Sequence, residues 1–156
     1  MIEAEDRAIL EGGGSGIVAG GADADGMPFV ARGWAIWFPT AAPDRVRVVV
    51  SADQGFDPSV VGRRVGVTAS DVATLVTRQI KGPVHEFGPA TPEDLEAMSR
   101  QTPAFFEAIH ETDGNSLSLL RRLLPAEVVA IEMTVDEVYD QTPGPGAGGS
   151  LVGSGR

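Results

Sequence analysis

The chain has 156 residues, of which 42% are hydrophobic and 22% are charged. That balance is typical of one ordinary globular domain and excludes an intrinsically disordered chain. With 22 acidic and 12 basic residues the net charge is −10, which argues against general nucleic-acid binding and against docking on anionic lipid. The sequence contains no cysteine, so disulfides, thiolate metal sites and thiol nucleophiles are excluded.

The N-terminus and the hydropathy of the sequence predict a cytoplasmic protein. Residues 1–6 (MIEAED) lack the basic and apolar regions of a secretory signal. No apolar run approaches the roughly 20 residues that are needed to cross a bilayer. We therefore expect neither a membrane nor a nucleic acid as a partner.

The first half of the chain predicts a short helix and then a series of strands. Residues 2–11 are expected to form an amphipathic helix that ends at the glycines of 12–14. Segment 22–26 (ADADG) has the chemistry of a hairpin turn, so its flanking strands should pair antiparallel. In segment 45–51 alternate residues are valines that point to one side. The expected strands are residues 15–22, 27–38, 45–51, 64–70, 75–86 and 127–135.

The second half of the chain carries the expected helices. Segment 91–94 (TPED) is a helix start, since it combines a threonine cap, a proline in the first turn and acids at the positive end of the helix dipole. Segment 102–103 (TP) repeats part of this signal, so we expect either two helices or one kinked helix ending near Glu111. A further short helix is expected over 116–124.

The order of these elements predicts the fold class. Five consecutive strands with no helix between each pair argue against a doubly wound parallel sheet. We expect a mainly β protein with peripheral helices (α+β), built on an antiparallel barrel of six strands. One domain should cover residues 1–141, and the Gly- and Pro-rich residues 142–156 should form an arm or a partly disordered tail.

Segment 74–82 (TLVTRQIKG) carries the most suggestive polar residues. If it is a strand, Thr77, Gln79 and Lys81 share one face, and Arg78 lies on the other with the apolar residues. A hydroxyl, an amide and an ammonium on one face could hydrogen-bond a flavin ring or a phosphate. The same pattern also fits the solvated side of a barrel wall, because antiparallel sheets often face water on one side.

Arg32 is the second candidate for a binding residue. It alternates with Val30, Trp34 and Ile36, so we expect it on an apolar face, where an unpaired charge is costly. Its partner should be an anion, either a carboxylate of the protein or a phosphate of a ligand. By the same alternation, Trp34 and Trp37 should lie on opposite faces of their strand.

Motifs for metal binding or nucleophilic catalysis are weak in this sequence. His85 and His110 lack the spacing of metal ligands, so no metal site is expected. Asp23 and Asp25 lack the further acidic residues of a calcium loop. Segment 12–16 (GGGSG) lacks the Gly-Lys-Ser/Thr sequence that completes a phosphate loop.

Three segments together resemble the pyridoxamine 5'-phosphate oxidase-related proteins, which are FMN-binding split barrels. The segments are 28–33 (PFVARG), 77–82 (TRQIKG) and 138–146 (VYDQTPGPG). The resemblance covers most of the chain and implies a homodimer with two flavin mononucleotide (FMN) sites between the subunits. It identifies the fold rather than one activity, because none of the three segments is a catalytic signature.

The resemblance also implies which residues contact the cofactor. Gln79 would contact the flavin ring together with Thr77. Arg32 would supply the basic contact of the second strand, and Ser51 the hydroxyl at the end of the third. Lys81 would offer a second positive charge. The implied cofactor-binding residues are Arg32, Ser51, Thr77, Arg78, Gln79 and Lys81.

One departure from the family concerns the cofactor's phosphate. Oxidases of the family usually carry an adjacent Arg-Lys pair after the third strand, whereas this chain has Phe56 and Asp57. The exchange should weaken phosphate binding by roughly several kcal/mol, at about 1.5–3 kcal/mol for each charged hydrogen bond. Arg63 and Arg64 could replace the pair if their loop folds back.

Two functional interpretations remain after these steps. The first is an FMN-dependent oxidoreductase of unknown substrate, in which the flavin does the redox chemistry and the protein binds, orients and tunes it. The second is a non-enzymatic split-barrel dimer that has lost FMN binding and binds another ligand, such as haem, or a partner. The pair Phe56 and Asp57 favours the second interpretation, and both predict a homodimer.

Overall fold

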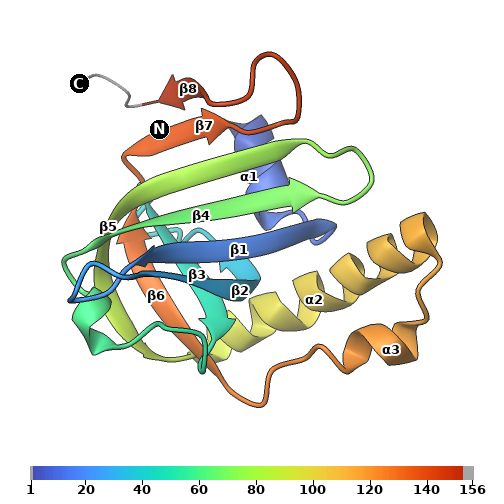
Figure 1. The fold of residues 1–156 in the computed structure, drawn as a ribbon, viewed down its shortest axis with the longest axis horizontal. Coiled ribbons are helices and arrows are strands. Elements are labelled where there is room, and N and C mark those ends of the chain that lie inside the picture. The colour runs from blue at the N-terminus through green and yellow to red at the C-terminus, as the bar shows by residue number, and fades with distance from the viewer. Residues whose placement is uncertain (1, 153–156) are drawn as a thin grey trace.

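A computed structural model describes residues 2–152, and its centre is a closed antiparallel β-barrel (Figure 1). The barrel strands are β1 (Ser15–Ala22), β2 (Pro28–Trp37), β3 (Arg45–Ser51), β4 (Arg64–Asp71), β5 (Thr77–Pro89) and β6 (Val128–Thr134). Their order is β4-β1-β2-β3-β6-β5, and the pairing of β4 with β5 closes the barrel. The prediction of a six-stranded antiparallel barrel is therefore confirmed.

Two further strands extend the sheet beyond the barrel. β7 (Glu137–Asp140) pairs with Arg78–Lys81 of β5, and β8 (Gly149–Val152) pairs with β7. The Gly- and Pro-rich tail therefore contains a strand that its composition did not predict. Residues 153–156 of that tail lie outside the described residues.

Four helical segments surround the barrel. They are α1 (Ala4–Glu11), the 3-10 turn η1 (Pro58–Val60), α2 (Pro92–Asp113) and α3 (Leu117–Arg121). α1 contacts strands β1, β2, β4 and β5 at one end of the barrel. α2 begins with the predicted Thr91 cap and continues through Pro103, so the region is one helix rather than two. None of the helices in residues 2–152 has the length and apolar character of a membrane span.

The protein has two apolar clusters on opposite sides of the barrel wall. The interior of the barrel is filled by aliphatic side chains, among them Ile36, Val48, Val67, Ile80, Ile131 and Met133. The second cluster lies between α2 and the outer surface of β2 and β3 and contains Trp34, Ala35, Val49, Ala97, Phe106 and Leu120. α2 therefore covers one part of the outer wall.

Buried polar contacts fix α2 on the sheet. The Asp94 side chain is 0% exposed and accepts two hydrogen bonds from Arg47, at 2.8 and 2.6 Å. It also accepts one from Nε1 of Trp37 at 2.8 Å and one from the backbone N–H of Thr91 at 2.8 Å. About two turns further along α2, Gln101 bonds both the N–H and the carbonyl of Ile36, as a neighbouring strand would do.

A β-bulge that follows Gly33 reverses the alternation of side chains along β2. Before the bulge, Arg32 points to the outside of the barrel, whereas after it Ile36 points into the core. Trp34 and Trp37 both pack beneath α2. Two expectations were therefore wrong: Arg32 and Ile36 do not share a face, and the two tryptophans do not lie on opposite faces.

Candidate functional site

The outer surface of the barrel away from α2 carries most of the predicted site residues. Neighbouring strands bring five residues into one row, in strand order Arg32 on β2, Val18 on β1, Thr68 on β4, Gln79 on β5 and Tyr139 on β7. Val30 and Lys81 belong to the adjacent row, and all seven side chains are exposed or partly exposed. We call this surface the open wall: Val18, Val30, Arg32, Thr68, Gln79, Lys81 and Tyr139.

A pair of glycines leaves the centre of the open wall without side chains. Gly20 on β1 lies directly opposite Gly66 on β4, between Val30 on one side and Lys81 on the other. A Cβ atom at Gly66 would lie 3.9 Å from Nε2 of Gln79 and 3.8 Å from Cγ of Lys81. Glycine within a strand often marks a place where another group approaches the backbone closely. The strip is bounded on the β2 side, because a Cβ atom at Gly20 would lie 2.7 Å from the carbonyl oxygen of Phe29 and 3.3 Å from Cγ2 of Val30. The bare backbone next to Gln79 is therefore that of Gly66.

The amide of Gln79 has a fixed orientation. Its Nε2 donates to Oγ1 of Thr68 at 3.0 Å, and its Oε1 accepts from Nε2 of Gln141 at 3.3 Å. Thr77, Gln79 and Lys81 share one face of β5, as predicted. Thr77 differs from the other two in being buried, with its Oγ1 2.9 Å from Oγ of Ser70.

Two cations of the open wall form no ion pair with a carboxylate of residues 2–152. Nζ of Lys81 lies 4.6 Å from the centre of the Tyr139 ring, a cation–π contact. The guanidinium carbon of Arg32 lies 5.9 Å from the Trp34 ring. The carboxylate partner considered for Arg32 is thus absent from the described part of the chain. Because Arg32 is exposed rather than buried, its unpaired charge costs little.

A hydrogen bond within the chain affects the ionisation of the Tyr139 hydroxyl on the open wall. Its hydroxyl donates a hydrogen bond to Glu137, and this bond raises the pKa of Tyr139. The tyrosine is therefore a neutral ring beneath the Lys81 ammonium at physiological pH.

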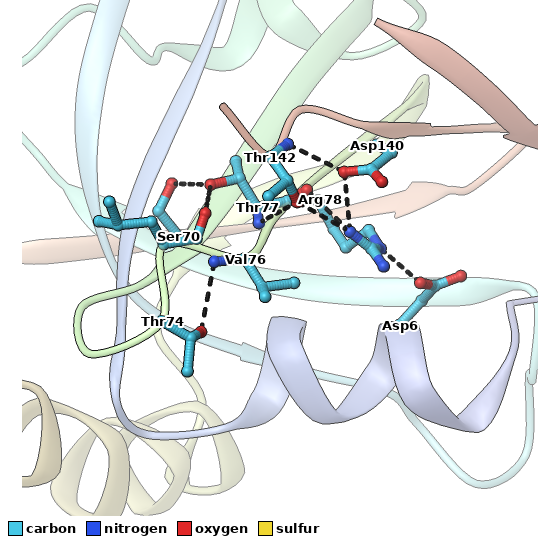
Figure 2. A network of polar contacts seen from close by, with 9 residues as sticks. Asp6, Ser70, Thr74, Val76, Thr77, Arg78, Asp140 and Thr142 are labelled. Carbon is cyan, nitrogen blue, oxygen red and sulfur yellow. Dashed lines mark hydrogen bonds and ion pairs between the residues drawn. The ribbon is translucent and has the colours of Figure 1, made fainter. Parts of the chain in front are cut away.

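Arg78 lies on the opposite side of β5 from the open wall. Figure 2 shows its guanidinium directed toward Asp6 on α1 and Asp140 on β7. The distances are 2.5 Å to Asp6 and 3.0 Å to Asp140, and Oγ1 of Thr142 lies 3.3 Å away. These contacts tie α1 and β7 to β5. The guanidinium of Arg78 therefore holds the barrel end together, on the face of β5 opposite to the side chain of Gln79.

Ser51 is also separated from the open wall. It is buried at the end of β3, where its Oγ accepts a hydrogen bond from Nε1 of Trp34 at 2.8 Å. The hydroxyl helps to seat the tryptophan under α2.

The residues after β3 do not form a site for a phosphate. Phe56 is 4% exposed and packs edge-on against Phe29, with ring centres 4.9 Å apart. Asp57 caps η1 by accepting from the backbone N–H of Ser59 at 2.7 Å, and the hydrogen bonds with Ser59 lower the pKa of Asp57. The pair is thus one core residue and one helix cap.

Neither of the neighbouring arginines replaces the missing cations. Arg63 donates to the carbonyl oxygens of Ser59 and Asp23, at 2.9 and 3.2 Å. Arg64 forms an ion pair with Asp136 at 2.7 Å and a second with Glu137. Both arginines are thus held by partners within the protein and do not take the place of the Arg-Lys pair.

The remaining polar candidates have local partners. Nε2 of His85 lies 2.7 Å from Oγ1 of Thr134, and Nδ1 of His110 lies 2.7 Å from the carbonyl oxygen of Asn115. Within residues 2–152, no group of three or more His, Asp or Glu side chains is placed to hold a metal ion.

Sequence reasoning missed three members of this region: Thr68, Tyr139 and Gln141. Thr68 had a detectable signal, because small or polar residues alternate with apolar ones along β4. Tyr139 and Gln141 lie in segment 138–146, which carried the resemblance, but their place beside Gln79 depends on the pairing of β7 with β5, which no local pattern predicts.

Comparison with known proteins shows the fold. No protein-family model and no curated protein matches the chain. HupZ of Group A Streptococcus is 14% identical, with a TM-score of 0.53 over 95% of this chain and 100% of that chain. A candidate pyridoxamine 5'-phosphate oxidase of Lactobacillus delbrueckii is 13% identical, with a TM-score of 0.50 over 88% of this chain and 93% of that chain.

A pyridoxamine 5'-phosphate oxidase-related, FMN binding protein of Nostoc punctiforme is 8% identical, with a TM-score of 0.47 over 90% of this chain and 80% of that chain. At such identities a structural likeness establishes the fold and nothing finer. The chain has the split-barrel fold of the pyridoxamine 5'-phosphate oxidase-related proteins, as its resemblance to them predicted.

Proposed function

We propose that the chain forms a homodimer that binds FMN on the open wall and acts as a flavin-dependent oxidoreductase. The observation that carries the proposal is the arrangement around Gln79. An oriented amide lies beside a strip of bare backbone at Gly20 and Gly66. Lys81 and Arg32 flank it and have no carboxylate partner among residues 2–152. This arrangement suits a flat ring with a hydrogen-bonding edge and a negative charge.

The residues of the open wall would bind and orient such a cofactor. A bound flavin supplies the redox chemistry itself. Thr68 and Gln141 hold the two ends of the Gln79 amide, so the amide keeps one orientation. The edge of the ring would meet it without rearrangement. Lys81 would hold a positive charge next to the ring.

Arg32 would meet the other end of the cofactor. It is separated from Gln79 by three interstrand spacings of about 4.8 Å, or roughly 14 Å along the wall. The ring part of FMN fits the residues present, but the segment after β3 offers the phosphate no cation, because Phe56 is in the core and Asp57 caps η1. The phosphate contact of this chain would therefore depend on Arg32.

A second copy of the chain would enclose the ligand. The open wall exposes apolar side chains, with Val18 46% and Val30 65% exposed, and Met27 at its edge is 63% exposed. Apolar groups gathered on one surface favour a protein contact. A two-fold dimer would bury this surface on both copies at once.

The visible spectrum of the purified protein tests the proposal first. We expect flavin absorption bands as isolated or after addition of FMN. Titration followed by flavin fluorescence should show that Gln79→Ala and Arg32→Gln each weaken binding about tenfold, the loss expected for one charge-assisted or fixed hydrogen bond. Arg100→Gln removes an exposed cation of α2 and should leave FMN binding unchanged. A colourless protein that takes up no FMN would refute the proposal.

A second candidate function follows from Phe56 and Asp57. Since these residues cannot hold a phosphate, the open wall could serve a non-enzymatic dimer that binds a ligand such as haem, or only a partner. Parallel titrations with FMN and haem separate the two candidates, because a tightly bound ligand raises the melting temperature. A rise with haem and none with FMN favours the second candidate, and the opposite result favours the first.

A further inference from the structure

A groove between α2 and α3 lies outside the site described above. Its volume is about 460 Å³, within the range of roughly 300–1,000 Å³ that small-molecule sites occupy. The apolar walls are formed by Leu95, Met98, Phe106, Leu117 and Leu124. From Leu95 to Glu107 the groove follows α2 for about 18 Å, at about 1.5 Å per residue. In Figure 1 the two helices lie side by side below the barrel.

The groove also has a few polar groups at defined places. Ser99, Glu107 and Arg121 lie along it. Pro103, four residues after Ser99, has no backbone N–H, so the carbonyl of Ser99 lacks the donor that a regular helix would provide. Apolar walls with a small number of fixed polar groups are typical of a ligand site.

The charge of the α3 wall differs in sign from the charge of the whole protein. Residues 114–126 contain Arg121 and Arg122 and no Asp or Glu, although the chain as a whole has a net charge of −10. Arg121 makes no ion pair within residues 2–152. Glu107 on the α2 wall is the single carboxylate that lines the groove.

We propose that this groove binds a small amphiphilic carboxylate. Its apolar body lies between Leu95, Phe106 and Leu124, and its carboxylate pairs with Arg121. An arginine is suited to this contact because its guanidinium can donate two parallel hydrogen bonds to a carboxylate. Glu107 repels the same ligand and limits its affinity. The proposal is independent of flavin binding on the open wall.

Isothermal titration calorimetry of the full chain with sodium decanoate tests the proposal, below the concentration at which decanoate forms micelles. We expect saturable binding of one decanoate per chain. Arg121→Gln should weaken it at least about tenfold, whereas Arg122→Gln, the matched control one residue away that does not line the groove, should change it less than about twofold. Glu107→Gln should strengthen it, and decylamine should bind at least about tenfold more weakly than decanoate.

A groove-filling variant checks the position of the ligand. Ser99→Leu places a good helix-forming residue at an exposed position of α2 and should block decanoate without changing the melting temperature appreciably. Absence of binding, equal losses in Arg121→Gln and Arg122→Gln, or equal affinity for decylamine would each overturn the proposal. So would a dimer that becomes monomeric in light scattering on Leu124→Asp, because the groove would then be covered by a second copy.

Discussion

The two outer parts of the barrel wall differ in how their polar groups are satisfied. Under α2, Arg47 and Trp37 both donate to Asp94, and Gln101 bonds the backbone of Ile36, so each buried polar group has a partner within the chain. On the open wall, Arg32 and Lys81 have no carboxylate partner among residues 2–152. The polar groups of the covered part are satisfied within the chain, whereas the two cations of the open wall remain accessible to a ligand or a partner.

The same difference separates two arginines of the barrel wall. Arg47 and Arg32 are both arginines on the outside of neighbouring strands, β3 and β2. The first is 11% exposed and held by a buried carboxylate, whereas the second is exposed and free of ion pairs in the described chain. Burial and partners, not residue type, separate a structural cation from a binding cation.

The largest effect is expected from breaking the covered part. Asp94→Ala leaves Arg47 buried without its main partner and should lower the free energy of unfolding by about 3–5 kcal/mol. Urea denaturation measures this change. Asp136→Ala is the matched control, because its partner Arg64 is half exposed, and it should cost less than about 1 kcal/mol. Equal losses in the two variants would contradict the contrast between covered and exposed ion pairs.

The next effect is expected on the open wall. Val30→Asp places a charge in the centre of the proposed dimer contact and should raise the dimer dissociation constant at least about a hundredfold. Light scattering and analytical ultracentrifugation measure the change. Val61→Asp, at a residue 47% exposed and off the open wall, should leave the dimer intact. A dimer that tolerates Val30→Asp as well would show that the copies meet elsewhere.

A smaller effect is expected from pH. Burial opposes the ionisation of Asp94, but the hydrogen bonds from Arg47, Thr91 and Trp37 outweigh it and hold the pKa of Asp94 below its ordinary value. The unfolded chain therefore binds more protons than the folded one between the two pKa values. The contribution of Asp94 is complete above about pH 4 and is lost as the pH falls below that value.

The comparison with Asp94→Asn isolates this contribution from the other carboxylates. The free energy of unfolding of the wild type should fall more steeply than that of Asp94→Asn as the pH decreases from about 4. Parallel pH profiles of the two proteins would show that Asp94 has an ordinary pKa.

The smallest effect is expected at the turn between β4 and β5, beside the open wall. Leu75 has a φ of 62° and is 57% exposed, so its backbone is strained and its side chain gains little from burial. Leu75→Gly should raise the free energy of unfolding by about 0.5–1 kcal/mol, whereas Leu75→Ala, which keeps the strain, should not. A loss of stability in Leu75→Gly that depends on protein concentration would place the leucine in the dimer contact.

Most of the barrel was predictable because its signals are local. The alternating valines of β3, the hairpin turn of segment 22–26 and the Thr91 cap each depend on a few consecutive residues, and each was found where the sequence predicted it. The bulge after Gly33 was not predictable, since it depends on the pairing of β2 with β3. Without the bulge, Arg32 and Ile36 would share one face, so Arg32 was expected among apolar side chains. In the structure its side chain is exposed.

The candidate site was predictable only in part, for a related reason. Gln79 and Lys81 were found from the alternation of β5 alone. The bare strip at Gly20 and Gly66 and the contacts of Gln79 with Thr68 and Gln141 arise from three other strands, which meet only in the folded barrel. Arg78 was assigned to the cofactor by the family resemblance, and no local pattern indicated its carboxylate partners on α1 and β7, which lie more than 60 residues away in the chain.

The place of β6 in the barrel has a consequence for synthesis of the protein. β6 inserts between β3 and β5, two strands that precede it in the chain by some 40 residues or more, and it is the last of the six barrel strands to be synthesised. A nascent chain that has not yet emerged past Thr134 therefore has two unpaired strand edges. Such edges can pair with other chains, so we expect ribosome-bound or prematurely ended chains to aggregate and the release of β6 to set the pace of folding.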